Sequence, residues 1–267
     1  MPIYKKVNKD FFKKWSHDMA YVLGFFAADG YITHNKRGAN FWSIEITDKQ
    51  LLYSIRNVVE SDHKISLRLR GAPNKNIYRL QVGSKEMVED LALHGFVSRK
   101  SRVLSLPRVP RKYFSSFVRG YFDGDGNVWS GLIHKERRTP MYSIVSVFTS
   151  CSKGFLVNLK TRLFEVSNIV GVIREKKEGS AYTLTYSIHG SLFLYDFMYN
   201  RVTSGLSTKL FLLRKKRVFE KYVRIRGCSS TVEHSPVTRE AVGSAPISRA
   251  RTPNPEHALG LLRCAAR

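Results

Sequence analysis

The hydrophobic positions of this chain fall into the same order of helical and strand-like segments twice. Residues 20–32 form an apolar run that stops at Asp-Gly, and residues 116–128 do the same about a hundred residues later. Each run is followed by a strand-like alternation and then by apolar residues at helical spacing, as at residues 41–47 and 48–61. Because self-similarity of this kind indicates a repeated architecture, we predict two halves of one plan.

Each half is predicted to run helix, two strands, helix, two strands, helix. In the first half, the elements after the apolar run are a strand at 41–47, a helix at 48–61 with Asp48 as N-cap, strands at 64–70 and 77–83, and a helix at 84–95. In the second half they are a strand at 141–150, a helix at 152–167, strands at 171–177 and 181–190, and helices at 191–200 and 208–226. We therefore predict a first repeat over 1–106 and a second over 107–226, with one shared core.

The two apolar runs carry small residues at every fourth position. These are Ala20, Gly24 and Ala28 in the first run, and Ser116, Gly120 and Gly124 in the second. A helix places such residues along one stripe, and a stripe without bulk lets two helix backbones approach closely. Glycine inside a helix costs up to ~1 kcal/mol relative to alanine, so its use here indicates a packing requirement. We predict that the two helices pack against each other through this stripe.

Both runs end in the same Asp-Gly pair. Gly30 and Gly126 are expected to take the left-handed conformation that follows many helices. Asp29 and Asp125 would then lie at helix C-termini, where the helix dipole already disfavours negative charge. If the helices pack side by side, the two carboxylates converge, and a hard cation such as Mg²⁺ would relieve their repulsion.

Composition narrows the class of partner. The 267 residues include 45 Lys+Arg against 21 Asp+Glu, a net charge of +24, while 43% are hydrophobic and 12% aromatic. That apolar content excludes a disordered basic tail, so the positive charge belongs to a folded surface suited to a polyanion such as nucleic acid.

Several other classes are excluded by the sequence. No apolar run is long enough to span a membrane, and the first residues lack a signal-peptide pattern. Three scattered cysteines indicate neither a disulfide framework nor a zinc cluster. We expect an intracellular protein, in a bacterial cytoplasm or an organelle, that is not secreted and acts as a monomer.

The two runs, VLGFFAADG at 22–30 and VRGYFDGDG at 118–126, resemble the motif of the LAGLIDADG homing endonucleases. The resemblance implies an α+β fold of two pseudo-symmetric αββαββα halves, packed through the paired motif helices and forming a saddle of antiparallel sheets. It also implies a single-chain enzyme that cuts both strands of a long DNA site with Mg²⁺ or Mn²⁺. The motif's last acid, which binds the metals in that family, maps onto Asp29 and Asp125. The earlier acid is Asp123 in the second copy and Ala27 in the first, a departure that leaves the metal ligands intact.

The resemblance also implies further catalytic residues. A lysine before the closing helix of each half, matched here by Lys100 and Lys209, would activate water or neutralise charge at the scissile phosphate. A polar side chain near the end of the second strand would position water. Glu45 matches that role in the first half, and its expected counterpart in the second half is Val147. The two strands would then be nicked at different rates.

DNA contacts are expected from the strands and the hairpin tips. Alternation places basic and polar residues on one face of the sheet, as a ribbon in the major groove requires. The predicted strand residues are Lys64, Ser66, Arg68, Arg70, Arg79, Gln81, Arg174 and Lys176, with Thr183, Thr185 and Ser187 nearby. The predicted phosphate contacts at the tips are Asn35, Lys36, Arg37, Lys135, Arg137 and Arg138.

Residues 227–267 differ in character from the rest of the chain. They are polar, rich in Ser, Pro and small residues, and without periodicity, so we predict a disordered tail. Residues 229–240 back-translate into codons that resemble the arms of a transfer RNA, which gives the hypothesis that the reading frame runs into a tRNA gene. Coding DNA unable to form those stems would refute it.

Two alternatives use the same scaffold. One is a maturase that binds its host intron RNA, and the other is a DNA-binding regulator without nuclease activity. Neither requires both aspartates, which favours cleavage. An intein is disfavoured, because the sequence begins with Met and has no terminal His-Asn pair.

Overall fold

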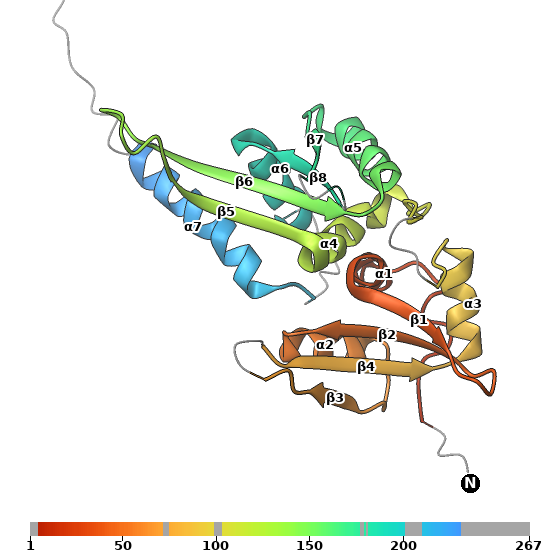
Figure 1. The fold of residues 1–267 in the computed structure, drawn as a ribbon. Helices are drawn as coiled ribbons and strands as arrows, with labels where there is room; N and C mark the ends of the chain where they lie inside the picture. The colour runs from red at the N-terminus through yellow and green to blue at the C-terminus, as the bar shows by residue number, and fades with distance from the viewer. Residues whose placement is uncertain are drawn as a thin grey trace, which may run out of the picture.

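The computed structural model describes residues 5–71, 75–98, 103–176, 179, 181–200 and 210–230, with side chains of the last helix described as far as residue 226. Figure 1 shows its two halves, which repeat one order of elements. The first half contains α1 (His17–Asp29), β1 (Gly30–His34), β2 (Asn40–Ile46), α2 (Lys49–Val58), β3 (Ile65–Arg68), β4 (Ile77–Gly83) and α3 (Lys85–Leu93). The second contains α4 (Phe114–Asp125), β5 (Gly126–Ile133), β6 (Met141–Ser150), α5 (Lys153–Ser167), β7 (Val172–Glu175), β8 (Tyr182–Tyr186), α6 (Ile188–Tyr195), a π-helical turn (Asp196–Asn200) and α7 (Leu213–Ser230).

Each half contains one antiparallel sheet of four strands. The strand orders are β1-β2-β4-β3 and β5-β6-β8-β7, so the second sheet repeats the topology of the first. The registers also match, because Gly30 pairs with Ile44 in the first half and Gly126 pairs with Phe148 in the second. The predicted α+β fold of two αββαββα halves is confirmed.

Local sequence signals set the helix boundaries. The Ser16 hydroxyl accepts a hydrogen bond from the Met19 backbone N–H at the start of α1, and Asp48 caps α2 in the same way, as predicted. The predicted bounds of β4 and β6 are confirmed, whereas the strands expected at 64–70, 171–177 and 181–190 are shorter in the structure. The strand predicted at 181–190 ends at Tyr186, because α6 begins at Ile188.

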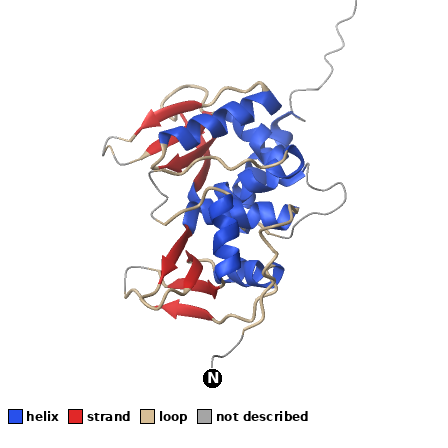
Figure 2. Cartoon of the chain, turned by 90° about the vertical axis from the view of Figure 1, so that its right-hand side faces the viewer, coloured by secondary structure: helices blue, strands red, loops and turns tan. Residues whose placement is uncertain are grey.

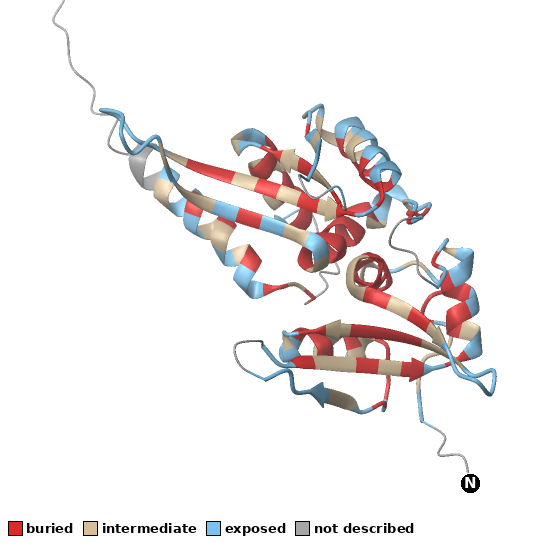
Figure 3. Ribbon diagram, viewed as in Figure 1, coloured by how far each residue is buried: buried red, intermediate tan, exposed pale blue. Residues whose placement is uncertain are grey.

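The strands and the helices form two layers. Figure 2 shows the strands of both sheets along one side of the molecule and most of the helices along the other. Buried and less buried residues largely alternate along β6 and partly along β4 and β5, β2 is buried at three successive residues, and α1 and α4 are buried along most of their length (Figure 3). One hydrophobic cluster spans both halves and includes Phe26, Trp42, Tyr121 and Phe148. The predicted shared core is therefore present.

The halves are joined by residues 103–110, which form no helix or strand, and by a 3-10 turn (Arg111–Tyr113) that leads into α4. Within the described ranges, no helix has the length and apolarity that a membrane crossing would need. Residues 231–267, most of the predicted tail, lie outside the described part of the chain.

Candidate active site and nucleic-acid interface

The helices α1 and α4 pack at backbone contact distance. A Cβ atom placed on Gly24 would lie 2.9 Å from the backbone nitrogen of Tyr121, and one on Gly120 would lie 2.9 Å from that of Phe25. In both cases a carbonyl oxygen of the opposite helix would be closer still. Only glycine fits these two positions, so their side-chain-free surface is what brings the two helices together.

The other small residues extend the same contact along the helix pair. Ala20 is fully buried, and the Ser116 hydroxyl is hydrogen-bonded to His17 Nδ1 at 2.9 Å. At the far end, a Cβ on Gly124 would overlap the Cβ of Ala28 and lie 3.1 Å from Oδ2 of Asp29. The carboxylate of one helix end therefore lies directly against the other helix.

Asp29 and Asp125 are the last residues of α1 and α4, as the motif predicts. Their glycine partners are not left-handed, because φ is −86° at Gly30 and −85° at Gly126, and each glycine is the first residue of a strand. Glycine is required for space instead. A Cβ on Gly30 would lie 2.5 Å from Cγ of the Phe26 ring, and one on Gly126 would overlap the Phe122 ring in the same way.

Lys215 of α7 reaches the end of α4, a role that sequence analysis missed. Its ammonium donates hydrogen bonds to four carbonyl oxygens, those of Phe122 (2.6 Å), Asp123 (2.7 Å), Gly124 (3.2 Å) and Gly126 (2.6 Å). The side chain is only 5% exposed, and burial lowers its pKa to about 8. A cation here satisfies carbonyls that the helix end leaves free and offsets the negative end of the helix dipole. The only sequence signal was a lysine in the first turn of the basic helix.

Asp123 lies in the core instead of at the surface. It is 1% exposed, and its Oδ2 accepts hydrogen bonds from the Tyr21 hydroxyl at 2.7 Å and the Leu212 backbone N–H at 2.8 Å. Burial raises the pKa of this carboxyl, and the nearby cations Lys215 and Arg119 oppose the rise. Asp123 thus ties α1, α4 and the segment before α7 together, two residues before the candidate metal ligand Asp125.

Glu45 lies beside the end of α1. Together with Asp29, Asp48 and Asp123 it lines a cavity of about 220 Å³ between the end of the helix pair and β2. Its Oε1 accepts a hydrogen bond from the Tyr31 hydroxyl at 2.7 Å. Burial, followed by that hydrogen bond, raises the pKa of Tyr31.

The expected counterpart of Glu45 in the second half was wrong by two residues. Gly30 pairs with Ile44, and the matching glycine, Gly126, pairs with Phe148. The next residue along each strand is Glu45 in the first half and Thr149 in the second, so the counterpart is Thr149. Val147 matches Ser43, since each is the residue before the strand partner of the glycine that follows the motif aspartate.

The predicted strand residues of the first half share one sheet face. Ser66 lies opposite Arg79 in the ladder, Arg79 lies opposite Glu45, and Gln81 lies opposite Ser43. Arg68 is exposed at the end of β3. The predicted residues Lys64 and Arg70 are exposed but flank β3, which is shorter than the alternation indicated.

The second half carries fewer basic residues on its sheet. Arg174 lies opposite Thr183 in the ladder, and Lys176 is exposed just after β7. Ser187 precedes α6 and is outside the strands. The hairpin residues Lys36, Arg37, Lys135, Arg137 and Arg138 are all exposed in the β1–β2 and β5–β6 connections, and the Asn35 side chain accepts from two backbone N–H groups of its own turn.

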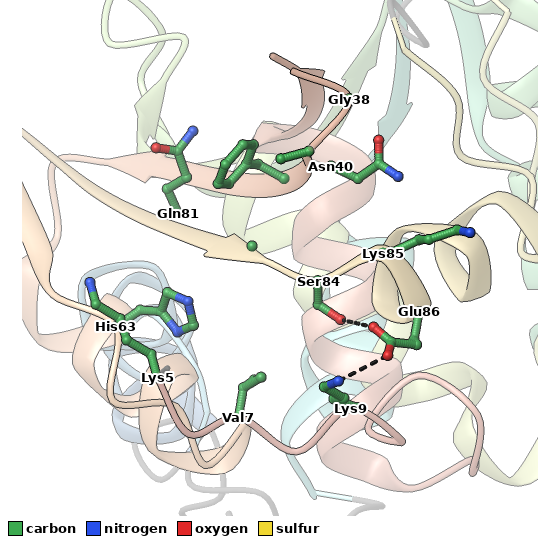
Figure 4. Close-up of a pocket in the computed structure, with 13 residues that line it drawn as sticks. Lys5, Val7, Lys9, Gly38, Asn40, His63, Gln81, Ser84, Lys85 and Glu86 are labelled. Carbon is green, nitrogen blue, oxygen red and sulfur yellow. Dashed lines mark hydrogen bonds and ion pairs between the residues drawn. The ribbon is translucent and has the colours of Figure 1, made fainter. Parts of the chain in front are cut away.

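A second hollow, of about 600 Å³, lies at the outer end of the first sheet. Its lining includes Lys5, Lys9, Lys85 and His63, with Gln81 at its edge. Figure 4 shows Glu86 held there by Lys9 and by the Ser84 hydroxyl. The Lys9 hydrogen bond is the main cause that lowers the pKa of Glu86 to about 2. These lysines, which sequence analysis did not single out, extend the basic surface beside the β1–β2 hairpin.

Two predicted residues, Lys100 and Lys209, lie outside the described ranges. Within those ranges, no three His, Cys, Asp or Glu side chains gather into a group that could hold a metal ion by itself. A metal at the helix pair would therefore have Asp29 and Asp125 as its protein carboxylates, with water or substrate oxygens completing the shell. Oxygen ligands of this kind fit Mg²⁺, which retains several waters and commonly binds phosphate oxygens.

The first half matches a known domain family. Residues 16–94, from α1 to α3, match the model of the LAGLIDADG-like domain. An uncharacterized protein of Methanocaldococcus jannaschii is 28% identical over 127 residues, covering 45% of this chain and 43% of that protein. The DNA-directed RNA polymerase subunit Rpo1C of the same organism is 29% identical over 120 residues, covering 43% of this chain and 13% of the subunit. The chain thus spans less than half the length of either relative.

Solved structures extend the likeness to both halves. The meganuclease I-SmaMI bound to uncleaveable DNA superposes with a TM-score of 0.54 at 14% identity, over 80% of this chain and 92% of that one. The LAGLIDADG homing endonuclease I-LtrWI bound to target DNA gives 0.53 at 14% identity, over 85% and 93%. A further I-SmaMI structure, bound to uncleaved target with calcium ions, gives 0.51 at 13% identity, over 83% and 94%. At these identities the likeness shows the fold.

Proposed function

We propose that this chain, whose residues 16–94 match the LAGLIDADG-like domain and whose two halves share the fold of LAGLIDADG meganucleases, is a site-specific DNA endonuclease that hydrolyses one phosphodiester on each strand of a long duplex target. The observation that carries this proposal is that two helices in backbone contact each end in an aspartate. Packing alone does not require an acid at either position, where the helix dipole disfavours it.

Asp29 and Asp125 would hold the divalent metal, Mg²⁺ or Mn²⁺. When bound, such a metal polarises the phosphate, orients a water molecule and stabilises the leaving oxygen. The protein's part is to keep the two carboxylates together, and the close contact at Gly124 and Ala28 does so without any flexible connection. The similar I-SmaMI complex with uncleaved target was obtained in the presence of calcium ions, which is consistent with a divalent cation in the proposed reaction.

Lys215 would act by charge and not as a base. An ammonium has three N–H donors, and four carbonyl oxygens already surround this one. It therefore has no proton to give to a substrate without leaving its site. Its positive charge beside Asp125 lowers the repulsion between the aspartates and stabilises α4. Contact with the scissile phosphates remains the proposed role of Lys100 and Lys209.

Glu45 is proposed to position water in the first half. It shares a cavity with Asp29, and Arg79 lies 4.0 Å away on the neighbouring strand. The matching residue, Thr149, has a hydroxyl and no charge. We therefore expect the two strands of the target to be nicked at different rates.

The exposed faces of the two sheets would lie in the major groove, because both face the side of the molecule away from most of the helices (Figure 2). The net charge of +24 and the basic hairpin tips support contacts with backbone phosphates. The complexes of I-SmaMI and I-LtrWI with DNA support the same mode of binding in this fold.

The test uses the DNA that flanks the gene, joined as it would be without the insert. We expect a discrete double-strand cut by the purified protein with Mg²⁺, and none by an Asp29→Asn, Asp125→Asn variant that still binds. An Asp62→Asn, Glu89→Gln variant, with two exposed acids changed elsewhere, serves as the matched control and should cut normally. Tight binding without a cut in both Mg²⁺ and Mn²⁺ would refute the endonuclease and favour an intron RNA maturase or a non-cleaving regulator.

A further inference from the structure

The two sheets carry different chemistry at matched positions of the faces that point away from the core. The registers align Ser43 with Val147, since each lies one residue before the partner of the first-strand glycine. On the next strand the same alignment pairs Gln81 with Thr185. At these positions the first half has a glutamine amide and a serine hydroxyl that is fully buried, whereas the second half has methyl groups, with one hydroxyl on Thr185.

Apolar side chains form a patch on the exposed face of the second sheet, among threonines and a few other polar residues. Trp129 lies opposite Val145, and the row beside it runs Asn127, Val147, Thr185, Val172 across four strands, with the exposed Asn127 at its β5 end. Trp129 is 48% exposed and Val172 is 49% exposed. The core face of the same strands is separate, because Ile144, Phe148 and Leu184 between them are fully buried.

The first sheet has hydrogen-bonding groups where the second has methyls. Arg79 and Gln81 lie on its exposed face, and Glu45 is bonded to Tyr31 there. These side chains match base edges that donate or accept hydrogen bonds, such as those of guanine and adenine. The matched residue for Arg79 in the second half is Thr183, because Leu80 and Leu184 occupy equivalent places in the ladders.

The surroundings of the apolar face favour a duplex as its occupant. Arg174 lies at one side of it, and exposed Lys135, Arg137 and Arg138 lie on the hairpin that continues β5. An apolar patch with a mainly basic rim, in which Glu136 and Glu175 are the acids, suits a polyanion whose inner surface carries apolar groups, and it lies on the same side of the molecule as the first sheet. In the major groove the one such group on a base is the C5-methyl of thymine.

We propose that the second half reads its half of the target through thymine methyl groups, with Trp129, Val145, Val147, Val172, Thr183 and Thr185 as the specificity-determining surface, while the first half reads by hydrogen bonds. This inference rests on the proposed DNA-binding function. It predicts a target with chemically unequal halves, in which the half under β5–β8 is rich in thymine at the contacted positions.

The first step of the test selects duplexes from a randomised pool with the wild-type protein in Ca²⁺. Gln81→Ala and Val147→Ser identify which half of the selected site each sheet contacts, since each should relax the base preference on its own side. Val147→Ser copies the residue that the first half has at this place. A wild-type melting temperature and an unchanged base preference in the half-site under the first sheet would show that the Val147→Ser variant folds.

The second step replaces thymine by deoxyuridine in one half of the selected site at a time, which removes the methyl and keeps every hydrogen-bonding group. In the half under the second sheet, we expect affinity to fall about fourfold for each buried methyl. In the other half we expect no change. In the Val147→Ser variant, replacing the thymine that Val147 contacts by deoxyuridine should no longer lower the affinity.

Sequence-specific binding that is insensitive to deoxyuridine in that half, or equally sensitive in both halves, would overturn the inference and leave the endonuclease intact. Random bases under the second sheet would also overturn it, and would point to a protein partner for the apolar face. Failure to select any DNA sequence would overturn the proposed function as well.

Discussion

The contact between α1 and α4 gives a quantitative prediction for Gly120→Ala. The added Cβ would lie 2.9 Å from the Phe25 nitrogen and closer still to the Tyr21 carbonyl oxygen. Both atoms belong to the backbone of the opposite helix, so no side-chain rotation relieves the overlap. The helices must move apart, and Asp29 and Asp125 at their ends move with them.

The magnitude follows from two opposing effects. Overpacking of a tight core costs about 1–3 kcal/mol, and a backbone overlap belongs at the upper end of that range. Replacing glycine by alanine in a helix returns up to ~1 kcal/mol. The net loss is about 2 kcal/mol, which corresponds to a fall of roughly 4–8 °C in melting temperature for a domain of this size.

The assay is thermal unfolding together with cutting of the target, and Gly154→Ala is the matched control. Gly154 is also helical, but a Cβ there would meet only the Ser152 hydroxyl at 4.0 Å. The control should be as stable as the wild type or slightly more stable, with normal cutting. If Gly120→Ala raised the melting temperature as the control does, the inferred contact between the two backbones would be wrong.

Three further predictions concern the parts around the helix pair. The pKa of Lys215 is lowered to about 8 from 10.5, so between these values the unfolded chain binds more protons. The free energy of unfolding of the wild type relative to Lys215→Met should therefore rise as pH increases from about 8 to about 10 in urea titrations, and a flat difference would contradict the burial. Asp123→Ala leaves two donors without an acceptor in the core and should cost about 3 kcal/mol in the same assay; a loss under 1 kcal/mol would exclude the Tyr21 and Leu212 bonds. Deletion of residues 231–267 should leave melting and cutting unchanged, and a clear loss of either would show that the tail contributes to the fold.

The sequence predicted the fold because its strongest signals are periodic and occur twice. The small-residue stripe identified the two helices, and Ser43 to Ile46 alternate as a half-buried strand should. A repeat doubles the weight of each local signal, so the order of elements was predictable in both halves. The ends of strands were not, since four-residue strands such as β3 stop where pairing stops, and pairing depends on residues far along the chain.

The candidate site could be predicted only for the acidic residues that lie at the end of a predicted helix. Asp29 and Asp125 were found because a helix end dictates their position. Lys215 was not, because its four carbonyl partners lie about ninety residues earlier in the chain, and a lysine in a basic helix is ordinarily solvated. The conformations of Gly30 and Gly126 were mispredicted for a related reason: the need for glycine comes from the phenylalanine ring below, and not from the backbone angle.

The two halves share a backbone fold but differ in side chains. The contact between α1 and α4 depends on this difference in side chains. Asp123 has no acid at its matched place, where the first motif has Ala27, and its hydroxyl donor is Tyr21 of the other half. The residue matched to Tyr21 in the second half is Phe117, which has no hydroxyl. Two copies of the second half would bury two carboxyls that each keep the Leu212 N–H but lack the tyrosine hydroxyl, while two copies of the first would have no buried acid for the tyrosine to bond. Unlike halves therefore stabilise this interface, just as unlike sheets would read an unlike target.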